Sequence, residues 1–168
     1  PEDAKAFAER KRAEDTERWL RHPLRERIIA GQPDGKIPAF LACELPDDRG
    51  VFANHEHWHC QLFTDLVLGD PKDPMLGKAV TVPDVYRMIG KAGFKMHTRA
   101  DRRGKAVLGF LYHLMEHGYL DFEDDWGYIS GDIKVVANLA HPPQEKEGGP
   151  TDSALAIDKA ETRRRQER

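Results

Sequence analysis

Cysteine is scarce in this sequence, which has only Cys43 and Cys60 among 168 residues. Two cysteines are too few for the disulfide framework of a small secreted protein, and no Cys-x-x-Cys spacing supports a structural zinc. A disulfide between the two is an alternative that no pattern motivates. We therefore expect an intracellular, reducing compartment, with cytoplasm, nucleus and organellar matrix left open.

Long apolar runs and catalytic signatures are also missing. No stretch of about 18 apolar residues occurs, so we expect no membrane insertion, and no signal-peptide pattern opens the chain. The sequence has no Gly-rich phosphate loop, no G-x-S-x-G and no cofactor fingerprint, so catalysis is the minority interpretation and no organic cofactor is expected. Pro1 fits an excised initiator, a cleaved precursor or a trimmed chain equally well.

The chain has no excess of positive charge. It carries 26 lysines and arginines against 29 aspartates and glutamates, a formal net charge of −3. Any contact with a polyanion must therefore depend on a local patch. The length allows one ordinary domain with extensions, because 39% hydrophobic residues suffice for a modest core.

The start of the chain, residues 1–50, predicts a charged helical arm. Residues 2–21 have the composition of a helix with few large apolar side chains. A second short helix is indicated at residues 24–29, and a compact apolar run follows at residues 37–45. We expect this arm to lie on a body or on a partner.

Helical periodicity dominates the centre of the chain. A first helix follows Asn54, a favourable N-cap residue, and a second starts near Pro83 and stops at Gly93. A third helix should begin at the N-cap Thr98 and end at Gly118. The side chains that we expect to be buried together are Leu62, Leu66, Ile89, Phe110, Leu111 and Leu114.

A hairpin should follow the third helix. Residues 119–122 alternate as a strand, residues 123–125 form a turn and residues 126–130 return. We expect Leu120 and Phe122 on the same face of this small sheet.

Three helices followed by a hairpin, over residues 55–130, resemble the winged-helix superfamily. The resemblance implies a mainly α fold with a small β-hairpin, built as a winged-helix-like central domain at residues 51–140. It also implies a module that contacts nucleic acid or another protein and rarely carries chemistry of its own. The remaining residues, 141–168, have the composition of a flexible tail that could become helical when bound.

Basic residues gather in the turn before the third helix and at its start. Lysine and arginine gain affinity for phosphates by releasing condensed counterions, and arginine can also read guanine. We therefore predict non-catalytic nucleic-acid binding here, with a solvated basic face as the alternative and Asp101 partly offsetting the charge. The predicted binding residues are Lys91, Lys95, His97, Arg99, Arg102, Arg103 and Lys105.

The tip of the predicted hairpin is acidic, which does not suit an approach to phosphates. Glu123, Asp124, Asp125 and Trp126 instead suggest a protein-binding surface, although a sheet residue such as Trp126 more often packs in the core or at the sheet edge. The alternative function is therefore that of a structural accessory subunit of a large protein or ribonucleoprotein assembly.

The sequence His55-Glu56-His57-Trp58-His59 matches H-E-x-x-H and resembles a zinc metalloprotease of the zincin type. The resemblance implies zinc held by His55 and His59, with Glu56 activating water, and Asp65 falls at the spacing of a third ligand. Against this, Asn54 would start the helix at the motif and Leu62 stands where a glycine is expected. Few residues also precede the motif.

Two other interpretations of this segment remain open. A structural zinc could be held by Cys43 and Cys60 with two of the three histidines, and we take Cys43, His55, His59 and Cys60 as the candidate set. Alternatively, the histidines are ordinary polar side chains at the start of an amphipathic helix, with no metal. No cofactor is required on this last reading.

Overall fold

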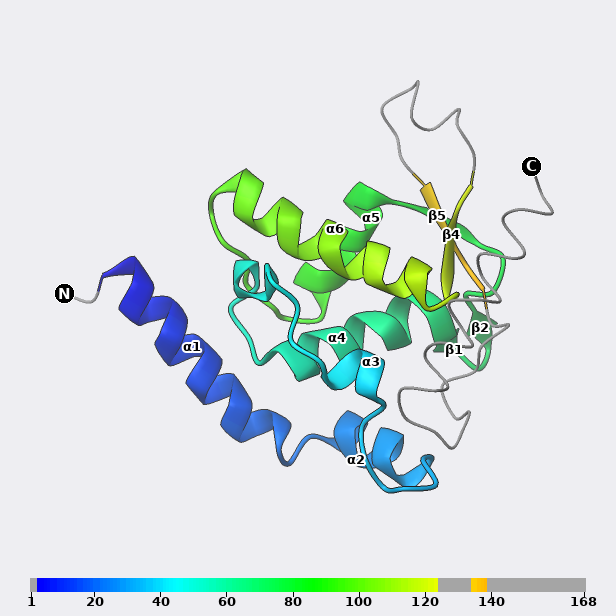
Figure 1. The fold of residues 1–168 in the computed structure, drawn as a ribbon, viewed down its shortest axis with the longest axis horizontal. Coiled ribbons are helices and arrows are strands. Elements are labelled where there is room, and N and C mark those ends of the chain that lie inside the picture. The colour runs from blue at the N-terminus through cyan, green and yellow to red at the C-terminus, as the bar shows by residue number, and fades with distance from the viewer. Residues whose placement is uncertain (1–2, 124–133, 139–168) are drawn as a thin grey trace.

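A computed structural model describes residues 3–123 and 134–138 of the chain. The described part is mainly helical and carries two small antiparallel sheets (Figure 1). No helix in it is long and apolar enough to cross a membrane. The predicted fold class is confirmed at this level, and the predicted tail at residues 141–168 lies outside the described residues.

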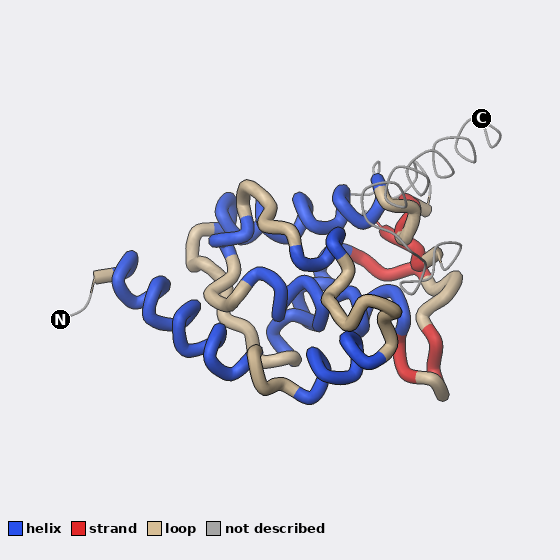
Figure 2. Tube along the Cα trace, turned by 60° about the horizontal axis from the view of Figure 1, so that its bottom comes forward, coloured by secondary structure: helices blue, strands red, loops and turns tan. Residues whose placement is uncertain are grey.

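The arm begins with the helix α1 (Ala4–Trp19), which the side chain of Asp3 caps by accepting from Ala6 N. Two shorter helices follow, α2 (Pro23–Ala30), as predicted, and α3 (Ala39–Ala42), which lies within the apolar run at residues 37–45. In Figures 1 and 2 the N-terminal end of α1 projects away from the rest of the molecule. The C-terminal end of α1 packs inward, because Trp19 is only 1% exposed.

The 3-10 turn η1 (Asp48–Gly50) joins the arm to the first central helix, α4 (His55–Phe63). Asn54 caps α4 as predicted, since its side chain accepts from Glu56 N. The helix continues through a π-helical turn, η2 (Thr64–Leu68), which ends where Gly69 adopts a φ of 71°. A two-residue ladder follows, formed by β1 (Gly69–Asp70) and β2 (Asp73–Pro74).

The second central helix, α5 (Val82–Lys91), has strong stop and start signals. Thr81 and Asp84 form a reciprocal capping box, and Pro83 lies in the first turn where it loses no hydrogen bond. Gly93 follows the helix with a φ of 95°, a conformation that glycine adopts without strain. These signals explain why the predicted ends agree with the structure.

The third central helix, α6 (Ala100–Glu116), starts later than predicted. We expected Thr98 as its N-cap, but Arg99 holds that position and its backbone N–H donates to His97 Nδ1 at 3.0 Å. The carbonyl of Thr98 instead accepts from the Arg103 guanidinium at 2.7 Å. The predicted stop at Gly118, with a φ of 84°, is confirmed.

The main sheet has the strand order β3-β5-β4, formed by β3 (Ala79–Thr81), β4 (Leu120–Phe122) and β5 (Lys134–Ala137). The strand that pairs with β4 is thus β5, whereas we expected the return at residues 126–130, which lie outside the described residues. Leu120 is buried as expected, but Phe122 at the end of the strand is 38% exposed.

The core is built from the helices of the arm, the central helices and the three-stranded sheet. The six side chains predicted to be buried together are all at most 2% exposed and belong to one cluster. Trp19, Leu24, Phe40 and Leu41 of the arm join the same cluster. The arm of residues 1–50 therefore packs into the core of the central region rather than merely lying on its surface.

Gly50 allows η1 to approach α6 closely, and this contact gives a first prediction. A Cβ at Gly50 would overlap the carbonyl oxygen of Arg102 and lie 2.8 Å from the Ala106 Cβ. Because backbone atoms must shift, we expect Gly50→Ala to lower the free energy of unfolding by about 1 to 3 kcal/mol. Gly90→Ala in α5, where a Cβ meets nothing within 4 Å, should instead stabilise by about 0.5 to 1 kcal/mol. Urea denaturation measures both changes, and equal changes in the free energy of unfolding for the two variants would contradict the close approach of η1 to α6.

Candidate functional site

The turn between α5 and α6 is braced by the end of the arm. Phe52 N donates to Lys95 O at 2.8 Å, and His97 N donates to Gly50 O at 2.8 Å. The His97 ring also packs edge-on against Phe52, with 5.7 Å between the ring centroids. The basic turn is therefore held in a fixed conformation rather than left as a loose loop.

The predicted nucleic-acid-binding residues divide into two groups. Arg99 forms an ion pair with Asp101, with 2.9 Å between Nη2 and Oδ2, and Arg103 donates to the carbonyls of the turn. His97 Nδ1 accepts from the backbone N–H of Arg99, the residue that precedes α6. These three side chains are therefore engaged in holding the turn and the first helical turn together.

The other four predicted cations are exposed. Lys91 ends α5, Lys95 lies in the turn, and Arg102 and Lys105 lie one helical turn apart on α6. None of the four has a side-chain ion pair or hydrogen bond among the described residues. Their charges are therefore available to a ligand.

The outward side of α6 continues beyond these cations. Arg102, Lys105, Gly109, Tyr112 and Glu116 follow helical spacing along one stripe, which we call the α6 face. Tyr112 is 51% exposed and packs edge-on against Phe122 of β4, with 5.9 Å between centroids. A Cβ at Gly109 would meet nothing within 4 Å, so the middle of the face is open to close approach.

Sequence reasoning missed Tyr112 and Gly109. The signal was present, because both fall outside the apolar stripe of the third helix, on the side opposite the core. Of the predicted protein-binding residues, Glu123 is exposed and its carboxylate lies 3.8 Å from Lys134 Nζ. Asp124, Asp125 and Trp126 lie outside the described residues.

The first two side chains of the H-E-x-x-H motif contact the arm. His55 Nε2 lies 2.8 Å from the carbonyl oxygen of Ala42 in α3. Glu56 accepts from Trp19 Nε1 at 2.8 Å, and Arg25 Nε of α2 lies 3.8 Å from the same oxygen. Glu56 therefore ties α1 and α2 to the start of α4.

His57 forms the second tie to α1. Its Nδ1 lies 3.0 Å from both carboxylate oxygens of Asp15, and one of these oxygens also accepts from Asn54 N. The ring stacks on Trp19 at 4.6 Å, with His22 close by. Burial and the neighbouring His57 lower the pKa of His22, so the neutral ring that caps α2 is favoured.

His59 is fully buried and bonded through both ring nitrogens. Nδ1 lies 3.0 Å from the carbonyl oxygen of Leu41, and Nε2 lies 2.8 Å from Asp48 Oδ1. A carbonyl oxygen can only accept, so Nδ1 donates to Leu41, and Nε2 shares a hydrogen bond with the Asp48 carboxyl group. Both ring nitrogens are therefore engaged with protein groups and are not free for a metal.

The four candidate zinc ligands are not brought together as a set. Within the described ranges, no group of three or more His, Cys, Asp or Glu side chains is placed to hold a metal. Cys43 Sγ lies 3.6 Å from His113 Nε2, while Cys60 is fully buried. Burial raises the pKa of both thiols.

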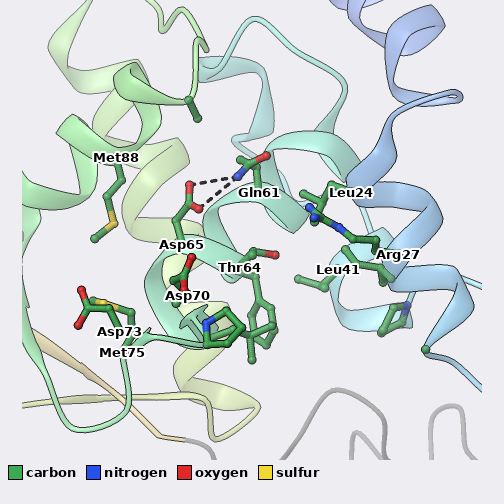
Figure 3. Close-up of a pocket in the computed structure, with 18 of the residues that line it drawn as sticks. Leu24, Arg27, Leu41, Gln61, Thr64, Asp65, Asp70, Asp73, Met75 and Met88 are labelled. Carbon is green, nitrogen blue, oxygen red and sulfur yellow. Dashed lines mark hydrogen bonds between the residues drawn. The ribbon is translucent and has the colours of Figure 1, made fainter.

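Away from α6, the structure contains an open groove of about 1190 Å³ (Figure 3). Its floor is η2, and its walls come from α2, the β1–β2 ladder and the end of α5. Asp65 lies at its centre and accepts from the Gln61 amide at 3.2 Å. Burial raises the pKa of Asp65. Sequence reasoning considered Asp65 only as a third zinc ligand.

Comparisons with protein-family models, with curated proteins and with solved structures returned no match. The function must therefore be argued from the site itself.

Proposed function

We propose that this chain is a non-catalytic, winged-helix-like protein that binds nucleic acid through the basic turn and the α6 face. The element order supports the fold part of the proposal. Helix α4 precedes strand β3, helices α5 and α6 follow, and β4 and β5 close a three-stranded antiparallel sheet. A short strand after the first helix, paired with the returning strand of the hairpin, is what a winged helix requires.

The observation that carries the functional part is the set of unpaired cations beside an open helix surface. Lys95, Arg102 and Lys105 are exposed and have no acidic partner among the described residues. The braced turn holds Lys95 close to the start of α6, which limits the conformational entropy that binding would cost. Since the whole chain is weakly acidic, such a local cluster is what could attract phosphates.

Charge reversal at Lys95, Arg102 and Lys105 should therefore abolish binding to a short DNA or RNA duplex. Each phosphate contact that is lost should also lower the slope of log affinity against log salt by about one unit. Fluorescence anisotropy over a range of salt concentrations measures both quantities. The control is charge reversal at Lys36 and Arg21, two exposed cations of the arm. Unchanged affinity and slope in the triple variant would exclude this interface.

A second function is favoured by the other half of the α6 face. Tyr112 and Phe122 form an exposed aromatic pair, and Glu116 and Glu123 add negative charge at the same end. Exposed aromatics beside acidic residues suit a protein partner better than phosphates. The alternative is therefore a structural accessory subunit of a large assembly, and co-purification that depends on Tyr112 would favour it.

Proteolysis is the weakest proposal. Glu56, which would activate the water, is engaged with Trp19 and Arg25, and both nitrogens of His59 are engaged with protein groups. These contacts assign the H-E-x-x-H segment to holding the arm. We propose that no metal is needed for the fold.

A further inference from the structure

The groove over η2 carries none of the proposed nucleic-acid contacts except Lys91, and no residue of α6 lines it. Its volume of about 1190 Å³ is above the range of about 300 to 1,000 Å³ that is usual for small-molecule sites. The groove is also partly open to solvent rather than enclosed. Both features fit a segment of polypeptide better than a compact ligand.

The walls of the groove are apolar on both sides. Leu24 and Ile28 of α2 line one wall, and Met75 and Met88 line the other (Figure 3). Methionine side chains are flexible and adapt to different aliphatic partners. These walls would bury aliphatic side chains of a bound segment.

Three carboxylates line the groove. Asp65 lies on the η2 floor and is partly buried, with the Gln61 amide as its hydrogen-bond partner (Figure 3). Asp70 and Asp73 lie on the β1–β2 wall, where Asp73 pairs with Lys78. A carboxylate that is partly removed from water is stabilised strongly by a cation that comes into contact with it. Arg27 of α2 and Lys91 of α5 line the walls and would repel a cationic side chain of a ligand. The favourable position for such a side chain is therefore next to Asp65, above η2, rather than along the whole groove.

The π-helical turn η2 places this carboxylate. Gly69 N bonds to Thr64 O across the turn, and the wide turn leaves Thr64 and Asp65 at the groove surface while Leu66 and Val67 enter the core. Single π-helical turns inside helices are frequent at functional sites.

We propose that this groove binds a peptide segment of a partner protein that carries a lysine or arginine between aliphatic side chains. The cation pairs with Asp65, and the aliphatic side chains pack between α2 and the two methionines. This site shares only Lys91 with the predicted nucleic-acid-binding residues, and none of Lys95, Arg102 and Lys105 lines it, so either proposal can fail without the other.

The test is a selection of peptides from a random display library against the full chain. We expect the selected peptides to contain lysine or arginine flanked by aliphatic residues. Asp65→Asn, which keeps an acceptor for Gln61, should lower their affinity by about tenfold or more, because it removes the charge partner. Met88→Gln should also lower the affinity. Asp47→Asn, at an exposed carboxylate outside the groove, should leave it unchanged.

Three outcomes would overturn the proposal. One is selection that yields no peptide above the background. Another is peptides that lack a basic residue or bind Asp65→Asn as tightly as the unmodified chain. The third is peptides that match residues 154–165 of this chain, since the groove would then be assigned to its own sequence. Thermal unfolding of each variant shows that lost binding does not reflect lost structure.

Discussion

Phe110→Ala should lower the free energy of unfolding by about 3 to 5 kcal/mol, the usual range for truncating a fully buried phenylalanine. The Phe110 side chain is 0% exposed and lies at the centre of the core. Its ring stacks on His59 at 4.5 Å and packs edge-on against Trp58 at 5.3 Å. Truncation would therefore remove contacts with α4 and leave a cavity beside the buried pair of His59 and Asp48.

Tyr112→Ala on the same helix provides the matched control. Tyr112 is 51% exposed, so its truncation should cost less than about 1 kcal/mol, and the two losses can be compared by urea denaturation. A loss below about 1 kcal/mol for Phe110→Ala would show that the inward face of α6 has been assigned wrongly.

The helices could be predicted because their signals are local. The capping box at Thr81 and Asp84 and the left-handed glycines Gly93 and Gly118 fix the helix ends within a few residues of sequence. The start of α6 was misplaced because Thr98 has the right chemistry for a cap. The Arg103 guanidinium donates to the carbonyl of Thr98, and Arg99 holds the N-cap position without a side-chain cap hydrogen bond.

The sheet was harder to predict because its strands are short and pair over long distances. β3 has three residues, too few for alternation to be recognised, and it follows directly into α5. It pairs with β5, whose register aligns Val80 with Val135. No local pattern indicates a pairing between residues 55 positions apart in the sequence.

The contacts of the H-E-x-x-H segment were also hard to predict, because they too join residues that are far apart in the sequence. Its residue types match a metal motif, but their partners come from the arm, such as Asp15 for His57 and Ala42 for His55. The residues that contact one another are up to 42 positions apart, so the sequence alone could not show that these side chains were already engaged. The groove around Asp65 was missed for a related reason, because its walls come from separate elements.

Gly104 and Gly109 each cost about 1 kcal/mol relative to alanine in a helix interior. A Cβ at Gly109 meets nothing within 4 Å, whereas one at Gly104 lies 3.5 Å from the Tyr86 hydroxyl of α5, so only Gly109 lies on the open α6 face.

Asp48 is expected to be the most sensitive charged position of the described chain. Its carboxylate accepts from Leu45 N at 2.7 Å and pairs with His59 at 2.8 Å, and it is only 4% exposed. Removing the Asp48 carboxyl group leaves the buried His59 Nε2 and the Leu45 N–H without their partner, so Asp48→Ala should cost about 3 to 5 kcal/mol. Asp47→Ala, at the exposed neighbour, should change stability by less than about 0.5 kcal/mol.

The loss of stability in Asp48→Ala should extend to the proposed interface. Asp48 is the first residue of η1, and the carbonyl of Gly50 in η1 accepts from His97 N in the basic turn. We therefore expect faster hydrogen exchange at His97 and Phe52 in Asp48→Ala, and weaker nucleic-acid binding under conditions where the variant is still folded. Adding His59→Leu should recover part of the stability, since the double variant removes the His59 ring that would otherwise lack its partner. A double variant that loses the full sum of both single losses would show that Asp48 and His59 act independently and that this buried pair does not hold the arm to α4.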